Sequence, residues 1–418
     1  MVSTRRDFLN SLSAIIGSSF LLTDSMLAKT IGNKKIHYPD ILADQYFLKK
    51  ESSYLNHASI GTVPKVVHNA HIKYLEICES NPSFYVWGKI WKDVTEQTRQ
   101  LASTLIRCNT DDLAITHNTT EGFNILAHGI RLSKNDEVLF STLNHAGASM
   151  SWKGLSKIKN FKVRTFEFPL DKMPKMNEQQ IVDIYISEIR SDTKVLIFPH
   201  IDNIVGLRHP MNKIAKEAKS RGVKYVFVDG AQSVGMIPVK LVNSNVDAYS
   251  MSPHKWLQAP KGTGMFYVNE KLRNELPRMW YKTPADRQDG SARKYEDYST
   301  RAWPAVVALG DAIRFQDTLG EKKKYNYYKT LWTEVKNLVN KNKNLYWHSP
   351  NKWGISSAIM SVEVLNKDAI ELSKVLENKY NIYLRPFKQP LNALRISPNM
   401  FNDIEEIENL LDIVTNKI

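Results

Sequence analysis

The stretch from Lys194 to Val268 constrains the fold most, because it alternates strand and helix patterns. Three apolar runs rich in β-branched and aromatic residues lie within it, and a helical pattern separates the first two. The runs are Val195–Phe198, Lys224–Val228 and Val246–Met251, and the helical pattern covers Met211–Ser220. This alternation predicts an α/β fold, in which ligand-binding groups collect beyond the carboxyl ends of the strands.

An acid and a lysine follow two of these predicted strands. Asp229 comes directly after the second run and Lys255 follows the third, so we expect them to be neighbours at one edge of the sheet. This pair suits pyridoxal phosphate (PLP). A desolvated lysine forms a Schiff base with the cofactor, and the acid keeps the pyridine nitrogen protonated so that the ring accepts electrons. Taken alone, a lysine after a strand is more often a solvated surface residue.

Three motifs in order strengthen this interpretation: Asp229-Gly230-Ala231-Gln232, Ser252-Pro253-His254-Lys255-Trp256 and Pro260-Lys261-Gly262-Thr263-Gly264. The series resembles the core of class V, fold type I aminotransferase-like enzymes, which include isopenicillin N epimerase-like proteins and cysteine desulfurases. The resemblance implies PLP as cofactor and Lys255 as the catalytic lysine. It also implies a fold type I PLP-dependent transferase, with a large mixed-sheet cofactor domain and a small α+β C-terminal domain.

The predicted helix that opens at Asn118-Thr119-Thr120-Glu121-Gly122 offers a phosphate site. Hydroxyls and free amides at a helix N-terminus favour an anion, although a threonine there can also be a plain N-cap. The resemblance implies that Thr119 or Thr120 binds the cofactor phosphate, with help from Ser252 and His254.

The remaining cofactor contacts also come from the resemblance. His145 aligns with the position that stacks on the pyridine ring, with a generic loop histidine as the alternative. Asn203 and Gln232 should face the ring oxygen, and a turn asparagine is the alternative for Asn203. Thr300 would reach the phosphate from the partner subunit of a homodimer, with the site at the interface. Ser299 stands where the family usually has glycine.

Substrate contacts are expected from both ends of the chain. The run Tyr54-Leu55-Asn56-His57-Ala58-Ser59-Ile60-Gly61 resembles the family's amino-terminal signature, which places Asn56 and Ala58 near the substrate. Leu394-Arg395-Ile396-Ser397-Pro398 resembles the run whose arginine takes the substrate carboxylate, a task that suits a planar bidentate donor. Arg395 is our candidate and Arg385 the second, with a surface ion pair as the alternative.

The chain divides into three expected parts. Residues 1–28 resemble a twin-arginine signal, because Ser3-Thr4-Arg5-Arg6-Asp7-Phe8-Leu9 precedes an apolar stretch that ends near Ala28. Residues 54–300 form the large PLP-binding domain, and residues 301–418, with part of 29–53, form the small one. We expect export to the periplasm by the twin-arginine machinery, with a cytoplasmic or membrane-anchored protein as the alternative. The apolar stretch is short for a spanning helix, so no stable membrane insertion is expected.

Composition excludes several other classes. The formal net charge is +14, but the lysines are scattered without a basic, aromatic-interleaved stripe, so we expect no nucleic-acid partner. Two cysteines cannot form a disulfide framework. The histidines show no ligand spacing, and we expect no metal site.

The predicted function is a PLP-dependent reaction at the α-carbon of an amino acid, a small-molecule substrate, as an isopenicillin N epimerase-like epimerase or transaminase. A C–S or β lyase is one alternative, and a catalytically silent binding protein on the same fold is another. Cysteine desulfurases carry a nucleophilic cysteine between the positions compared with Arg385 and Arg395. Here residues 386–392 contain no cysteine, so desulfuration through a persulfide is not expected.

Overall fold

The structure is a computed structural model that describes residues 38–87, 89–282 and 290–418. The twin-arginine signal expected at residues 1–28 lies outside the described residues. Across the described ranges, no helix combines the length and the apolar character that crossing a membrane requires.

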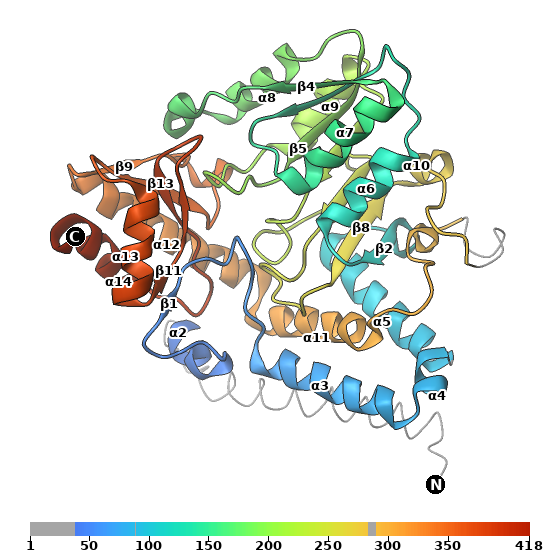
Figure 1. The fold of residues 1–418 in the computed structure, drawn as a ribbon, viewed down its shortest axis with the longest axis horizontal. Coiled ribbons are helices and arrows are strands. Elements are labelled where there is room, and N and C mark those ends of the chain that lie inside the picture. Colours follow the sequence, from blue (N-terminus) through green and yellow to red (C-terminus); the bar gives the residue numbers. More distant parts are fainter. Residues whose placement is uncertain (1–37, 88, 283–289) are drawn as a thin grey trace.

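A seven-stranded mixed sheet forms the centre of the larger part of the molecule (Figure 1). Five neighbouring strands are parallel, while β8 runs antiparallel to both of its neighbours at the other edge. In spatial order the strands are β2 (Leu113–Thr116), β8 (Gly264–Val268), β7 (Ala248–Met251), β6 (Tyr225–Asp229), β5 (Thr193–Pro199), β3 (Glu137–Ser141) and β4 (Lys162–Phe166). The expected α/β fold with a large mixed sheet is confirmed.

Helices cover both faces of this sheet because alternate strand residues point to opposite sides. In β5, Val195 and Ile197 pack with α6 (Thr119–Gly129) and α7 (Ala146–Lys159). Leu196 and Phe198 face the other cluster, with α8 (Glu178–Ser187) and α9 (Met211–Ser220). Burial on both faces explains why the strands read as continuous apolar runs.

A helical layer lies beside the sheet (Figure 1). It contains α3 (Lys65–Ser80), α4 (Pro82–Trp87), α5 (Lys89–Ile106) and α11 (Trp303–Leu319). Tyr74, Trp91 and Val307 belong to one small core that joins α3, α5 and α11. By packing, α11 therefore lies with the large domain, although the expected domain boundary falls before it.

The C-terminal part is built on a four-stranded antiparallel sheet. Its strands are β12 (Arg385–Phe387), β13 (Ala393–Ile396), β10 (Met360–Val364) and β9 (Leu345–Trp347), in spatial order. It is accompanied by α12 (Glu321–Lys341), α13 (Ala369–Tyr380) and α14 (Ile404–Asp412). This is the α+β unit that the sequence predicts.

The N-terminal segment connects the two parts. After α2 (Tyr38–Leu42), strand β1 (Ser53–Tyr54) pairs in parallel with β11 (Ile382–Tyr383). The chain then passes between the two parts to reach α3 (Figure 1). Residues 55–64 therefore lie where the two domains meet.

Candidate active site

Asp229 and Lys255 meet at the carboxyl edge of the central sheet. Asp229 ends β6, and Lys255 lies in the turn after the neighbouring strand β7. Burial raises the pKa of Asp229, against the opposing effects of the Ala231 amide, which donates at 2.9 Å, and the charges of His145 and Lys255. The expected proximity of Asp229 and Lys255 is therefore found.

Burial also affects the protonation of the Lys255 amine. It lowers the pKa of Lys255 to about 8, and the charge of Arg395 acts in the same direction, while Asp229 opposes both. Within the described residues the Lys255 amine has no hydrogen-bond partner. It is a desolvated amine that becomes neutral near physiological pH, as a Schiff-base lysine requires.

His145 and Thr120 converge on Gly147. The Nδ1 atom of His145 accepts a hydrogen bond from the Gly147 amide at 3.1 Å and caps α7. A Cβ atom at Gly147 would lie 2.6 Å from the Thr120 hydroxyl and 3.2 Å from His145 Nδ1, so only glycine allows this approach. Burial lowers the pKa of His145, and the charge of Asp229 opposes this effect. The imidazole is thus a largely neutral, accessible ring next to the acid.

Hydroxyl groups gather at the N-terminus of α6. Asn118 caps the helix by accepting the Glu121 amide at 3.0 Å, so the alternative that a threonine is the cap is wrong. The Thr119 hydroxyl lies 2.8 Å from the Ser252 hydroxyl, and both side chains are buried. Thr120 is exposed. These groups and the positive end of the helix can hold a phosphate.

The His254 ring lies against the backbone of Thr263. Its Nδ1 atom lies 3.4 Å from the Thr263 carbonyl oxygen, and burial lowers its pKa. Its own carbonyl accepts the Gly61 amide at 3.0 Å. His254 thus fixes the turn that carries Lys255, and its proposed contact with the phosphate stays a prediction.

Gln232 connects the lysine turn to the N-terminal signature. Its amide nitrogen donates to the Ala58 carbonyl oxygen at 2.9 Å, and its oxygen accepts the Trp256 indole N–H at 2.7 Å. Gly61 packs so closely that a Cβ atom there would lie 2.1 Å from the Lys255 carbonyl oxygen. The expected contact of Gln232 with a ring oxygen stays a prediction, whereas its positioning role was not foreseen.

Arg395 is a buried cation that has no carboxylate partner among the described residues. Its Nη1 atom donates to the Asn203 carbonyl oxygen at 2.9 Å, and Nη2 donates to Asn56 at 2.9 Å and to Ser59 at 2.5 Å. Its Nε atom is buried with no hydrogen-bond partner. No ion pair involves this guanidinium in the described part of the chain. Burial lowers the pKa of Arg395 to about 9, and Arg385 contributes to this effect.

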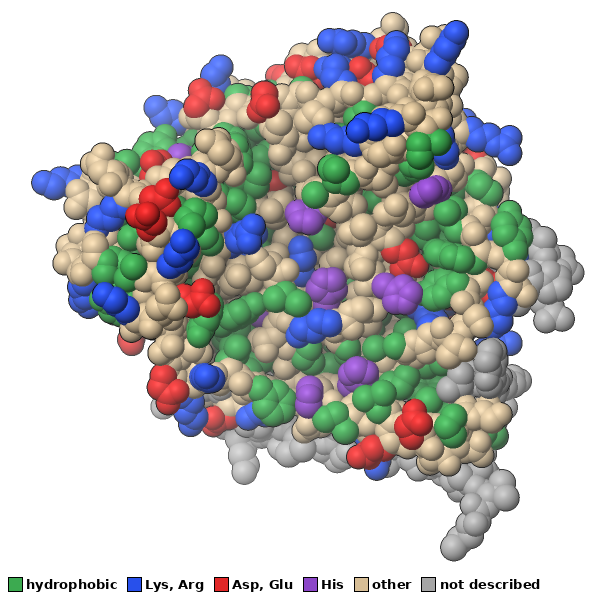
Figure 2. All heavy atoms as spheres, in the orientation of Figure 1, with side chains coloured by type: hydrophobic (Ala, Val, Ile, Leu, Met, Phe, Trp, Pro, Cys, Tyr) green, Lys and Arg blue, Asp and Glu red, His purple; other side chains and the backbone are tan. Residues whose placement is uncertain are grey.

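The structure brings the predicted substrate residues together around Arg395. Asn56 contacts it, and Arg385 occupies the directly opposite position on the adjacent strand. Asn203, expected at the cofactor's ring oxygen, contacts Arg395 through its backbone carbonyl, and its contact with the cofactor stays a prediction. Ala58 lies next to them through its bond to Gln232. Ser59 is the contact that we did not single out, although it lies within the same N-terminal signature. On the face shown in Figure 2, histidine and basic side chains gather in the middle, between the two domains.

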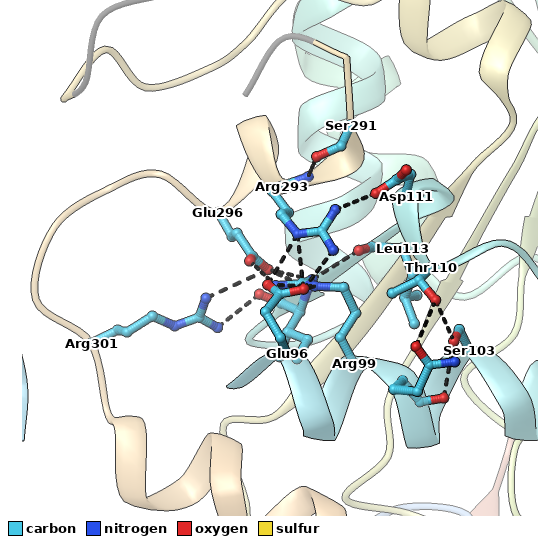
Figure 3. A network of polar contacts seen from close by, with 12 residues as sticks. Glu96, Arg99, Ser103, Thr110, Asp111, Leu113, Ser291, Arg293, Glu296 and Arg301 are labelled. Carbon is cyan, nitrogen blue, oxygen red and sulfur yellow. Dashed lines mark hydrogen bonds and ion pairs between the residues drawn. The ribbon is translucent and has the colours of Figure 1, made fainter. Parts of the chain in front are cut away.

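The segment that carries Thr300 is anchored to α5 and β2 by the network in Figure 3. Arg99 donates to the Leu113 carbonyl oxygen at 2.8 Å and pairs with Glu296. Glu296 in turn accepts the Ile115 amide at 2.5 Å, and Arg301 donates to the Ile115 carbonyl oxygen at 2.7 Å. These bonds cover the free edge of strand β2.

The anchored segment leaves Ser299 and Thr300 exposed. Ser299 has a φ of 83°, in the region that favours glycine, so the backbone keeps the geometry of the family's usual residue. The contact of Thr300 with a partner subunit stays a prediction.

The residues present fit PLP. A buried carboxylate stands next to a buried lysine amine, neither of which forms an ion pair with the other described residues, and hydroxyls lie at the N-terminus of α6. The His145 ring lies close enough to Asp229 and Lys255 for their charges to act on it. Together, fold and site define a fold type I PLP-dependent enzyme. No group of acidic, histidine or cysteine residues in the described ranges has the arrangement of a metal site.

The chain belongs to the aminotransferase class-V family, whose sequence model matches residues 53–410. It is 26% identical over 332 residues to isopenicillin N epimerase of Streptomyces clavuligerus, covering 76% of this chain and 82% of that protein. It is 23% identical over 364 residues to hercynylcysteine sulfoxide lyase of Schizosaccharomyces pombe, covering 83% and 89%.

Solved structures agree on the fold. A mutant of C-DES, a cystine C–S lyase, with glycine covalently linked to its PLP cofactor superposes with a TM-score of 0.78 at 20% identity. The match covers 92% of this chain and 100% of the other. Because the chain belongs to the aminotransferase class-V family and has residues that fit PLP, it is a PLP-dependent enzyme, and the alternative of a silent binding protein is set aside.

Proposed function

We propose that the enzyme acts at the α-carbon of an amino acid, as an epimerase or transaminase. Arg395 carries this proposal, because it is a buried guanidinium with an unpartnered Nε close enough to Lys255 for their charges to interact. A planar guanidinium binds a carboxylate through two hydrogen bonds, and a buried one without an acid partner is suited to a ligand carboxylate. When bound, PLP supplies an electron sink for the bond broken at the α-carbon.

The roles of the other residues follow from their environments. Lys255, with a pKa of about 8, can both give up and accept a proton near neutral pH, so it is suited to remove the α-proton. Asp229 is buried next to it and would hold a proton at the pyridine nitrogen. His145 would cover the ring and keep water from it. Arg395, fixed by Asn56, would orient the substrate with its α-carbon toward Lys255.

A lyase reaction is the second candidate, since two of the similar proteins are named as C–S or sulfoxide lyases. Elimination begins with the same removal of the α-proton, so the same residues would serve. Cysteine desulfurases are also among the similar proteins, but their persulfide route requires a nucleophilic cysteine between the positions compared with Arg385 and Arg395. Residues 388–392, which join β12 to β13, contain no thiol, and Cys78 lies on α3 while Cys108 follows α5.

Incubation of the PLP-loaded enzyme with a panel of amino acids in deuterated water tests the proposal. NMR should show deuterium at the α-carbon of at least one amino acid. Both enantiomers then indicate epimerisation, a keto acid with loss of the cofactor's visible band indicates transamination, and a keto acid with a released sulfur fragment indicates elimination. Lys255→Ala should abolish exchange, whereas Lys261→Ala, in the same turn region, should retain it. No exchange with any amino acid would show the proposal to be wrong.

We also propose that the protein is exported by the twin-arginine route as a homodimer. The sequence around Arg5 and Arg6 supports export, and the exposed, anchored Thr300 supports a contact between subunits. Arg5→Lys together with Arg6→Lys should keep the protein out of the periplasmic fraction of a host. Sedimentation of the loaded enzyme should give twice the mass of one chain, and a monomer would contradict the dimer.

A further inference from the structure

Two arginines occupy directly opposite positions on neighbouring strands of the small domain. In the antiparallel pair of β12 and β13, Arg385 lies across from Arg395, so both side chains leave the same face of the sheet. Their guanidinium carbons lie 6.0 and 5.7 Å from the centre of the Phe387 ring. Like charges directly opposite one another destabilise a sheet. A bound anion would relieve this repulsion.

No acid of the described residues supplies that compensation. Neither guanidinium forms an ion pair within residues 38–87, 89–282 and 290–418. Asp202 acts on Arg395 through its charge, but its oxygens accept the backbone amides of Ile204 at 2.7 Å and Leu207 at 2.6 Å. Asp202 is thus engaged by its own loop, and the two arginines remain available to a ligand.

The two arginines differ in their burial and in the hydrogen bonds that orient them. Arg395 is 2% exposed and held by Asn56, Ser59 and the Asn203 carbonyl oxygen, which leaves it oriented for one carboxylate. Arg385 is exposed and lies on Phe387 without a polar partner in the described part of the chain. One carboxylate can be bound by one guanidinium in a bidentate pair. A second guanidinium beside it provides for a second acid group.

We propose that the substrate is an amino acid with a second carboxylate in its side chain, which Arg385 binds while Arg395 binds the α-carboxylate. This inference rests on the proposed function at the α-carbon. Arg385 is then the residue that determines specificity, and its position on β12, toward the solvent, places the second carboxylate at the outer end of the site.

Calorimetric titration of the PLP-loaded enzyme with ligands that cannot react tests whether Arg385 binds a second carboxylate. The probes are succinate, glutarate and adipate, which lack the α-amino group, with butyrate and valerate as monocarboxylates. We expect at least one dicarboxylate to bind about tenfold more tightly than the monocarboxylates, as a charge-assisted contact implies. Arg385→Gln should remove this difference by weakening dicarboxylate binding far more than monocarboxylate binding. Arg385→Lys should keep part of it.

Lys388→Gln is the matched control, because Lys388 is an exposed cation on the same connection that pairs with Asp368 at 3.4 Å. It should retain the preference for dicarboxylates. A wild-type enzyme without this preference, or a preference that survives Arg385→Gln, would overturn the inference. Deuterium exchange at the α-carbon separates the two proposals. If exchange occurs without a bias toward dicarboxylic amino acids, only the proposal of a second carboxylate is refuted. If no amino acid shows exchange, the proposed function itself is refuted.

Discussion

The amine of Lys255 should react with added PLP at a pH well below that of an ordinary lysine. Burial, with the charge of Arg395, brings its pKa to about 8 despite the opposing effect of Asp229. The neutral amine is the nucleophile. At pH 8 about half of the Lys255 amines are neutral, compared with roughly 0.3% for a lysine of ordinary pKa, a difference of roughly 150-fold.

Stopped-flow absorbance of cofactor uptake by the apoprotein, from about pH 6 to about pH 10.5, measures this midpoint. The same reaction of Nα-acetyl-lysine in each buffer cancels the cofactor's own titrations. Asp229→Asn removes a charge that raises the pKa, so the midpoint should fall. Arg395→Gln removes a charge that lowers it, so the midpoint should rise. A wild-type midpoint near that of free lysine, or shifts of both variants in one direction, would refute the reasoning.

Three further predictions concern stability, measured by urea unfolding of the loaded enzyme. Trp256→Phe leaves the buried Gln232 oxygen without its indole donor and should cost about 1 to 3 kcal/mol, while an unchanged midpoint would argue against that bond. Glu296→Gln removes one of the two carboxylates that pair with the buried Arg99, the other being Glu96, and should cost about 1 to 3 kcal/mol, and a loss of only a few tenths of a kcal/mol would show that the pair with Glu296 contributes little to stability. Ser299→Gly should stabilise the protein by about 1 kcal/mol, because its φ of 83° is unfavourable for a side chain, and a destabilised variant would contradict that conformation.

The strands of the large sheet were predictable because burial on both faces makes them continuous apolar runs. Helix α7 was not predicted. Residues 146–159 contain two glycines and several serines, which are poor helix formers, and the helix is stabilised by the His145 cap and by burial of Trp152. Two short strands, β11 and β12, follow one another closely at residues 382–387, and only tertiary pairing separates them, since Ile382 pairs with β1 whereas Arg385 pairs with β13.

The candidate site was predictable where chemistry marks single residues, as at Asp229, Lys255 and Arg395. It was not predictable where a polar side chain forms a hydrogen bond with a segment that is distant in the sequence. Gln232 bonds to Ala58, 174 positions earlier, and Arg395 bonds to Ser59, 336 positions earlier. No local pattern encodes such pairs, because they exist only once the N-terminal segment has packed between the domains.

These long-range hydrogen bonds also explain how the site accommodates the positive charge of Arg395 without an acid partner among the described residues. A buried cation such as Arg395 is costly unless hydrogen bonds satisfy it, and here Asn56, Ser59 and the Asn203 carbonyl oxygen provide neutral acceptors instead of an acid. An acid partner would stabilise the free protein more but would compete with a ligand carboxylate. Because neutral acceptors orient the guanidinium and leave its charge unpaired, the electrostatic gain is deferred until an anionic ligand binds.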